Sequence, residues 1–321
     1  MDRPRRRPGL LIAAAALAPL AVALGAAGSA APPLRAMRWL APGADAARIL
    51  TRQPTECFRP PADPERAYSA ELGRAAFRTP LLLGGQAARA GVACETCHRN
   101  GRTNSDFDFP GLSGAPGTAD VTSSLFSSHR GDGVDNPRPI PDLGGPKRAL
   151  KVSQDPASPT LETFIHGLVT QEFDGAEPPP SVLKGLADYV RAMDPAACIG
   201  KHEEAVSLAN DMANARRALR TAIAAAGRGD RAASGLMVTA ARSQLGNVAE
   251  RYAGNGLARD RAALERADDD LRSVLDSLRS KSEVGAVRRL EDWLARSGAL
   301  EAKLATDTQR SLYDPRAFPH R

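Results

Sequence analysis

The sequence of 321 residues predicts an all-α protein: short helices and long turns over residues 67–196, then an antiparallel helical bundle over residues 197–321. Two observations predict this class. Apolar residues in the second region recur every three or four positions, as they do on the buried face of a helix. That region also has no proline between Pro195 and Pro315. Hydrophobic residues make up 42% and charged residues 25% of the chain, which excludes a mainly disordered protein.

Residues 1–30 have the pattern of a secretory signal peptide. Four arginines within residues 3–7 precede an apolar run over residues 9–25, and small residues follow over 26–30. The run is shorter than the ~20 apolar residues of a membrane-spanning helix, which favours cleavage. The alternative, an uncleaved anchor, would keep the protein at a membrane. Either way the sequence predicts a periplasmic or otherwise exported protein in an oxidising compartment.

The charge balance argues against a nucleic-acid partner. The formal net charge is +6, and it falls to +3 when the arginine-rich residues 1–30 are removed. Binding to DNA requires a concentrated basic surface, which so small an excess does not provide.

Residues 31–66 are Pro-rich and irregular. We interpret them as a tether before the first domain, with one short helix near residues 44–50.

The C-terminal region predicts helices separated by short breaks. The breaks fall at residues 227–229, 254–256 and 280–283, where glycine or polar residues are typical of helix ends. Connections this short favour antiparallel neighbours, and the bundle would offer a surface for a partner or an oligomer. The apolar stripes are Leu208, Met212, Ala215, Leu219 and Ile223; Met237, Ala241, Leu245, Val248 and Tyr252; Leu257, Leu264, Ala267, Leu271, Val274 and Leu278; and Val287, Leu290 and Leu294.

The segment Cys94-Glu95-Thr96-Cys97-His98 is a C-x-x-C-H motif, the pattern of c-type haem attachment. Cys94 and Cys97, one helical turn apart, would form thioethers with the two vinyl groups, and His98 would ligate the iron. A thioredoxin-like redox pair would need a βαβ unit around the motif, and a zinc site would need further ligand pairs. The sequence shows neither, so we expect one covalent haem c.

The surroundings of the motif resemble the bacterial di-haem cytochrome c peroxidase family, which includes the methylamine-utilisation di-haem enzymes. The resemblance covers residues 68–194 and implies a cytochrome c-like haem domain over residues 67–196. The residues that carry it are Leu72-Gly73-Arg74-Ala75-Ala76-Phe77, Gly91-Val92-Ala93, Asn100-Gly101-Arg102, Arg130-Gly131-Asp132-Gly133, Asn136-Pro137, Ile140-Pro141-Asp142-Leu143 and Thr160-Leu161-Glu162.

One departure from the family shapes the expected function. Its peroxidases use two haems, whereas this chain has one C-x-x-C-H motif. The leading prediction is therefore an exported mono-haem cytochrome that exchanges electrons with a redox partner protein, such as another cytochrome or a dehydrogenase. The alternatives are a peroxidase-like enzyme with an open iron position and a haem-based sensor or binding module.

The sixth iron ligand stays open at this stage. Met193 ends an apolar stripe with Val182, Leu186 and Tyr189, which favours a core role. The other candidates are His166, on a helix expected to start with Ser158 as N-cap and Pro159 in the first turn, His129 in a turn, and Lys151. An open or water-occupied position is the slight favourite.

Two further features concern the same domain. Cys57 and Cys198 bracket it, and the oxidising compartment favours a disulfide between them. Glu172 and Asp174 lie in a turn and offer a carboxylate for acid catalysis, although solvated turn carboxylates are the simpler interpretation.

Overall fold

The computed structural model describes residues 34–145, 148, 150–200, 203–254, 256–280 and 283–318. Helices make up most of these residues and the strands are very short, which confirms the all-α class. The predicted signal peptide, residues 1–30, lies outside the described residues. None of the described helices is long and apolar enough to cross a membrane.

The Pro-rich stretch contains regular structure. A 3₁₀ helix η1 (Arg35–Trp39) precedes α1 (Ala46–Thr51), which confirms the short helix expected near residues 44–50. Asp45 caps α1 by accepting from the backbone N–H of Arg48 at 3.0 Å. The next strand, β1 (Arg52–Pro54), pairs in antiparallel fashion with β6 (Glu203–Ala205).

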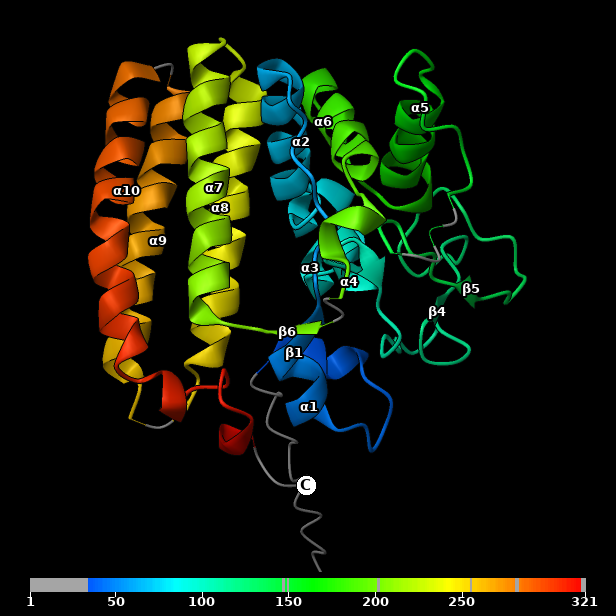
Figure 1. Cartoon of the computed structure of the whole chain (residues 1–321), viewed down its shortest axis with the longest axis horizontal. Coiled ribbons are helices and arrows are strands. Elements are labelled where there is room, and N and C mark those ends of the chain that lie inside the picture. Colours follow the sequence, from blue (N-terminus) through cyan, green and yellow to red (C-terminus); the bar gives the residue numbers. More distant parts are fainter. Residues whose placement is uncertain are drawn as a thin grey trace, which may run out of the picture. The chain divides into compact units, whose positions relative to one another are not determined.

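Two helices cross at the centre of the first region. They are α2 (Pro64–Ala76) and α6 (Pro180–Arg191), and they lie side by side in Figure 1. A Cβ atom on Gly73 would lie 1.9 Å from the carbonyl oxygen of Gly185, so the two backbones touch at this point. The crossing buries Leu72, Leu186 and Tyr189.

The rest of this region consists of short elements joined by long turns. Helix α5 begins at Thr160 with Pro159 in the N-cap position, one residue later than expected, so the predicted Ser158 cap is wrong. The Ser158 hydroxyl instead bonds the hydroxyl of Thr160. The remaining elements are η2 (Pro80–Leu83), α3 (Gly85–Ala90), α4 (Cys94–Cys97), β2 (His98–Arg99), β3 (Arg102–Thr103), β4 (Thr118–Ala119), β5 (Arg138–Pro139), α5 (Thr160–Gly167), the π-helical turn η3 (Leu168–Glu172) and η4 (Pro195–Cys198).

Four long helices follow, and they are α7 (Leu208–Gly227), α8 (Arg231–Arg251), α9 (Ala258–Arg279) and α10 (Glu283–Ala305). Each packs against the next, and α10 returns to pack against α7 (Figure 1). The three predicted breaks fall in the connections between these helices and overlap the helices by one residue at Gly227 and at Glu283. The chain continues through η5 (Thr308–Arg310) and η6 (Pro315–Ala317). Helix α2 packs against both α7 and α8, which joins the first region to these helices.

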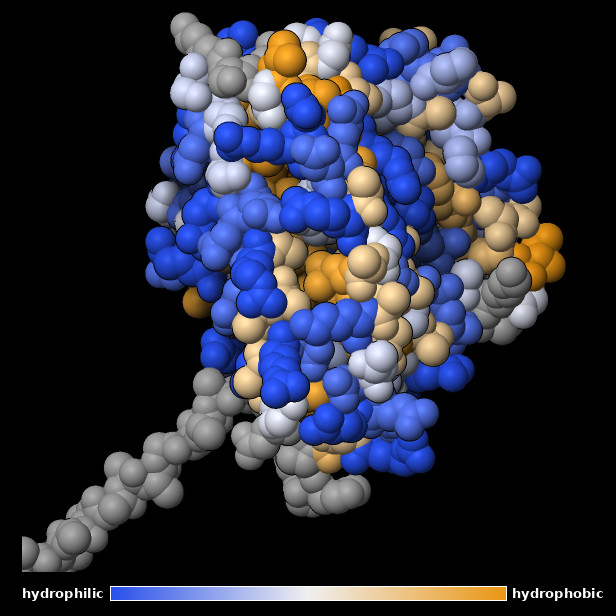
Figure 2. Space-filling model, turned by 90° about the vertical axis from the view of Figure 1, so that its left-hand side faces the viewer, coloured by the Kyte–Doolittle hydropathy of each residue, from blue (hydrophilic) through white to orange (hydrophobic). Residues whose placement is uncertain are grey.

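The apolar stripes are buried as predicted on α7, α8 and α9, apart from the half-buried Ile223. On α10 the predicted stripe is partly wrong. Leu290 is buried, but Val287 and Leu294 are only half-buried. The buried face includes Trp293, whose indole N–H donates to the carbonyl of Ala267 on α9 at 3.0 Å. Figure 2 looks onto the α9 and α10 side, which is mostly hydrophilic around a narrow apolar strip.

Candidate functional site

The predicted haem motif forms a single helical turn, α4, with His98 as its C-cap residue. The hydroxyl of Thr96 accepts from the backbone N–H of Ala93 at 3.0 Å and fixes the start of the turn. Cys94 and Cys97, three positions apart, therefore lie on neighbouring parts of one helical face. The structure thus brings the three predicted site residues together.

Neither motif cysteine forms a disulfide among the described residues, and both are half-buried against the apolar core. Burial raises the pKa of Cys94 and of Cys97 to about 12. A thioredoxin-like pair needs an attacking thiol whose pKa is lowered, because the thiolate is the nucleophile. The raised pKa values therefore argue against a thiol-exchange role for this C-x-x-C pair.

The His98 ring is held by one backbone carbonyl. Its Nδ1 lies 3.0 Å from the carbonyl oxygen of Pro141. Since a carbonyl can only accept, Nδ1 carries the proton and the lone pair remains on Nε2. Burial lowers the pKa of His98 to about 4, although the bond to Pro141 opposes this shift. The imidazole is therefore neutral at pH 7, which is the form that ligates a metal.

Pro141 is a site residue that the motif did not reveal. The sequence marked residues 140–143 only as part of a family resemblance. The contact joins positions 43 residues apart, and no local pattern indicates which carbonyl reaches His98. A Pro at this position cannot donate a backbone hydrogen bond, but its carbonyl remains a full acceptor.

The motif packs against the large apolar core, and the ring centroid of His98 lies 6.3 Å from that of Phe77. The same core contains further aromatic side chains. Four phenylalanines form a row with ring centroids 6.3, 5.1 and 6.0 Å apart, in the order Phe107, Phe109, Phe126 and Phe173. Half-buried aliphatic side chains pack on the same core, and they are Val121, Leu150, Val152 and Ile165. Half-buried apolar side chains of this kind suit a large planar apolar ligand.

The four candidates for the sixth ligand have different surroundings. Met193 is 1% exposed and packs against Gly101 and Gly144, which confirms its predicted core role. The Nε2 atom of His166 lies 2.7 Å from a carboxylate oxygen of Glu177. His129, in a bend, and Lys151 are both exposed. The neighbouring residues Pro146, Lys147 and Ala149 lie outside the described residues.

The two turn carboxylates differ sharply. Asp174 accepts from the backbone N–H and the hydroxyl of Ser128 at 2.7 and 2.8 Å, and these bonds lower its pKa. One oxygen of Glu172 lies 3.1 Å from Arg130 Nη1. Its other oxygen is buried and has no hydrogen-bond partner within the part of the chain that the structure describes. Burial raises the pKa of Glu172, so this carboxyl holds its proton more strongly than usual.

A buried ionic cluster lies directly behind the motif, and sequence reasoning missed it. Glu95, inside the motif, accepts from the backbone N–H of Asn100 at 2.9 Å, and its other oxygen lies 3.5 Å from Arg78. Arg78 also bonds Glu56 at 3.0 Å, and the Tyr189 hydroxyl donates to the same Glu56 oxygen at 2.7 Å. The cluster connects α4 to α2 and α6. Arg74 also pairs with Glu56.

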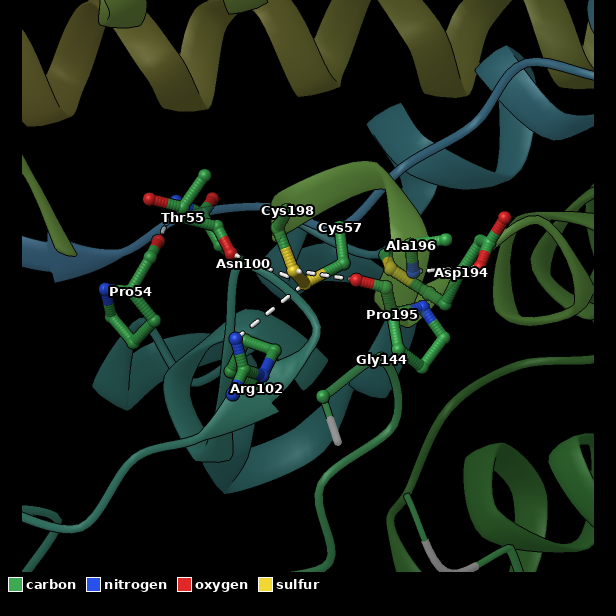
Figure 3. Close-up of a disulfide and its surroundings, with 12 residues drawn as sticks. Pro54, Thr55, Cys57, Asn100, Arg102, Gly144, Asp194, Pro195, Ala196 and Cys198 are labelled. Carbon is green, nitrogen blue, oxygen red and sulfur yellow. Dashed lines mark hydrogen bonds between the residues drawn. A yellow bond between two sulfur atoms is a disulfide. The ribbon is translucent and has the colours of Figure 1, made fainter. Parts of the chain in front are cut away.

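The predicted disulfide between Cys57 and Cys198 is present, with the sulfur atoms 2.00 Å apart (Figure 3). Cys57 is fully buried and Cys198 is 6% exposed. The four cysteines therefore divide into one disulfide pair and the two motif cysteines, which form no disulfide.

No group of three or more His, Cys, Asp or Glu side chains that could hold a metal ion by itself occurs in the described ranges. A haem iron takes four ligands from its porphyrin and needs only an axial ligand from the protein. A separate cavity of about 210 Å³ has Glu95, Thr96 and Arg99 in its wall, but neither motif cysteine nor His98.

Comparison with known proteins adds no relative: no family model, curated protein or solved structure matches this chain.

Proposed function

We propose that the protein is an exported mono-haem c-type cytochrome that exchanges electrons with a redox partner protein. Its cytochrome c-like domain would span residues 67–196, and α7 to α10 would form an antiparallel bundle that docks the partner or a second copy. The observation that carries the proposal is the state of His98. Its Nδ1 is bonded to Pro141, which leaves the lone pair on Nε2 for a ligand, and His98 directly follows a C-x-x-C pair that forms no disulfide.

The residues present fit a c-type haem. Cys94 and Cys97 would hold it by adding their S–H groups across the two vinyl groups, which forms S–C bonds without an oxidant. His98 would bind the iron through Nε2, and the apolar core against which the motif cysteines pack would keep water away. When bound, the haem supplies reversible one-electron transfer at its iron.

The test is the pyridine haemochrome spectrum of protein exported from a host that matures c-type cytochromes. We expect one thioether-linked haem per chain in the wild type. The Cys97→Ser variant should show a spectrum typical of one remaining thioether, or no haem. As the matched control, Ser234→Ala alters a buried hydroxyl on α8 and should keep the full spectrum. Wild-type protein without covalent haem would refute the proposal.

A peroxidase-like enzyme is the second candidate, and Glu172 favours it. Burial raises the pKa of Glu172, and a carboxyl that holds its proton more strongly is better suited to act as a general acid. A high-spin ferric spectrum, with peroxide turnover that Glu172→Gln abolishes, would support this candidate. A low-spin spectrum that neither peroxide nor cyanide changes would exclude the peroxidase candidate and support electron transfer as the function.

A further inference from the structure

The carbonyl that holds His98 belongs to a loop, residues 140–145, which docks on the β2–β3 hairpin. The hydroxyl of Thr103 donates to the carbonyl of Ile140 at 3.0 Å. The backbone N–H of Leu143 donates to the carbonyl of Gly101 at 3.1 Å. These two contacts fix the chain on both sides of Pro141.

An ion pair at the adjacent position closes the loop. Arg102 Nε lies 2.9 and 3.0 Å from the two carboxylate oxygens of Asp142, and both side chains are largely buried. The same carboxylate accepts from the backbone N–H groups of Gly144 and Gly145 at 3.1 and 2.7 Å. Asp142 therefore shapes the turn that directly follows Pro141, and Arg102 holds Asp142 in place.

The packing around this ion pair leaves no spare room. A Cβ atom on Gly145 would lie 2.1 Å from an Asp142 oxygen and 2.4 Å from Arg102 Nη2. Arg102 Nη1 also lies 3.5 Å from the Cys57 sulfur, so the disulfide supports the same guanidinium (Figure 3). Three separate parts of the chain thus meet at Arg102.

We propose that Arg102 is a positioning residue for His98. It fixes Asp142, Asp142 fixes the turn after Pro141, and the Pro141 carbonyl fixes the Nδ1–H group of His98. This inference rests on the proposed function, because it concerns His98 as an iron ligand. A hydrogen bond from Nδ1–H to a carbonyl makes the imidazole a more basic ligand. A more basic ligand favours ferric iron, so loosening the bond raises the reduction potential.

A purely structural ion pair would stabilise the fold without affecting the iron ligand. Arg242 provides the matched control, since its guanidinium binds both oxygens of Asp268 at 2.8 Å. This pair joins α8 to α9, and its side chains are about a quarter exposed. Neither residue belongs to the loop or to the hairpin.

The experiment compares wild-type, Arg102→Gln and Arg242→Gln holoproteins by redox titration and by the iron–histidine stretching frequency of the ferrous haem. We expect Arg102→Gln to titrate at a higher potential with a lower stretching frequency, and Arg242→Gln to match the wild type. Arg102→Lys keeps the positive charge but loses the planar guanidinium group, and should shift the reduction potential less, in the same direction.

Wild-type values in Arg102→Gln, with haem fully attached, would overturn this inference and leave the proposed function standing. If Arg102→Gln yields no folded holoprotein, Arg102→Lys decides: a shifted potential supports the inference and an unshifted one overturns it. Wild-type protein that lacks covalent haem would overturn the proposed function and this inference together.

Discussion

His98 and Glu56 are both partly buried ionisable residues, but the groups around them shift their charge states in opposite directions. Burial lowers the pKa of His98 to about 4, and no carboxylate forms an ion pair with its ring among the described residues. Burial alone would raise the pKa of Glu56. The guanidinium groups of Arg78 and Arg74, with the Tyr189 hydroxyl, outweigh that effect and lower the pKa to about 2. His98 is thus kept neutral and Glu56 charged.

The depressed pKa of Glu56 predicts acid sensitivity. Its stabilising contribution is complete above its ordinary pKa of 4.5 and is lost as the pH falls towards about 2. Glu56→Gln should lower the free energy of unfolding at pH 7 by roughly 3–5 kcal/mol, because it leaves buried arginines without their partner. The free energy of unfolding of this variant should also change less than that of the wild type between about pH 4.5 and about pH 2. Chemical denaturation of the holoprotein over this pH range measures both effects.

The control for this prediction is Glu65→Gln. Glu65 pairs with Arg228 at 2.8 Å, but its side chain is 74% exposed. An exposed ion pair contributes at most about 1 kcal/mol. Equal stability of the Glu56 and Glu65 variants would show that the buried cluster is not a stabilising unit.

Individual residues could be predicted where their role depends on a local sequence motif or on the redox state of the expected compartment. The motif pointed to Cys94, Cys97 and His98 as a candidate site, and the expected oxidising compartment predicted the disulfide between Cys57 and Cys198, which is present. Pro141 and Glu56 could not be predicted. Their hydrogen-bond partners lie far away in the sequence, and neither a proline carbonyl nor a glutamate indicates by its type which residue it will contact.

Among the elements, the crossing of α2 and α6 positions the motif, since Tyr189 of α6 reaches the ionic cluster behind α4. Gly73 to Ala should destabilise the protein by about 1–3 kcal/mol, because the added methyl would overlap the backbone at Gly185. Gly246 on α8 has nothing within 4 Å of the corresponding position. Gly246 to Ala should therefore be neutral or stabilising by about 1 kcal/mol. Thermal unfolding of both variants tests this, and equal melting temperatures would contradict a close crossing.

Periodicity predicted the long helices well because each buries one continuous face. It located α7, α8 and α9 with their buried stripes. On α10 it was only partly right: Leu290 is buried as predicted, but Trp293 and Ser297 also belong to the buried face and neither is an aliphatic residue. The short elements around the motif depend on turns and distant contacts, so periodicity carried little information there.

At the scale of the whole molecule, the Pro-rich N-terminal stretch is joined through α8 to the segment that follows α10. Arg251 on α8 donates to the carbonyls of Leu50 and Leu312 at 2.9 and 2.7 Å. Strand β1 pairs with β6, and the disulfide closes the span between residues 57 and 198. Contacts group residues 32–321 as one compact unit. Composition could not reveal these connections, because each joins residues more than 60 positions apart.

The central claim is that Cys94 and Cys97 are occupied by covalent haem while Cys57 and Cys198 pair with each other. Intact mass spectrometry combined with thiol titration of the denatured, unreduced exported protein tests it most directly. We predict a mass equal to the processed chain plus one haem, with no titratable thiol. A colourless protein with the mass of the polypeptide alone and two reactive thiols would contradict the account.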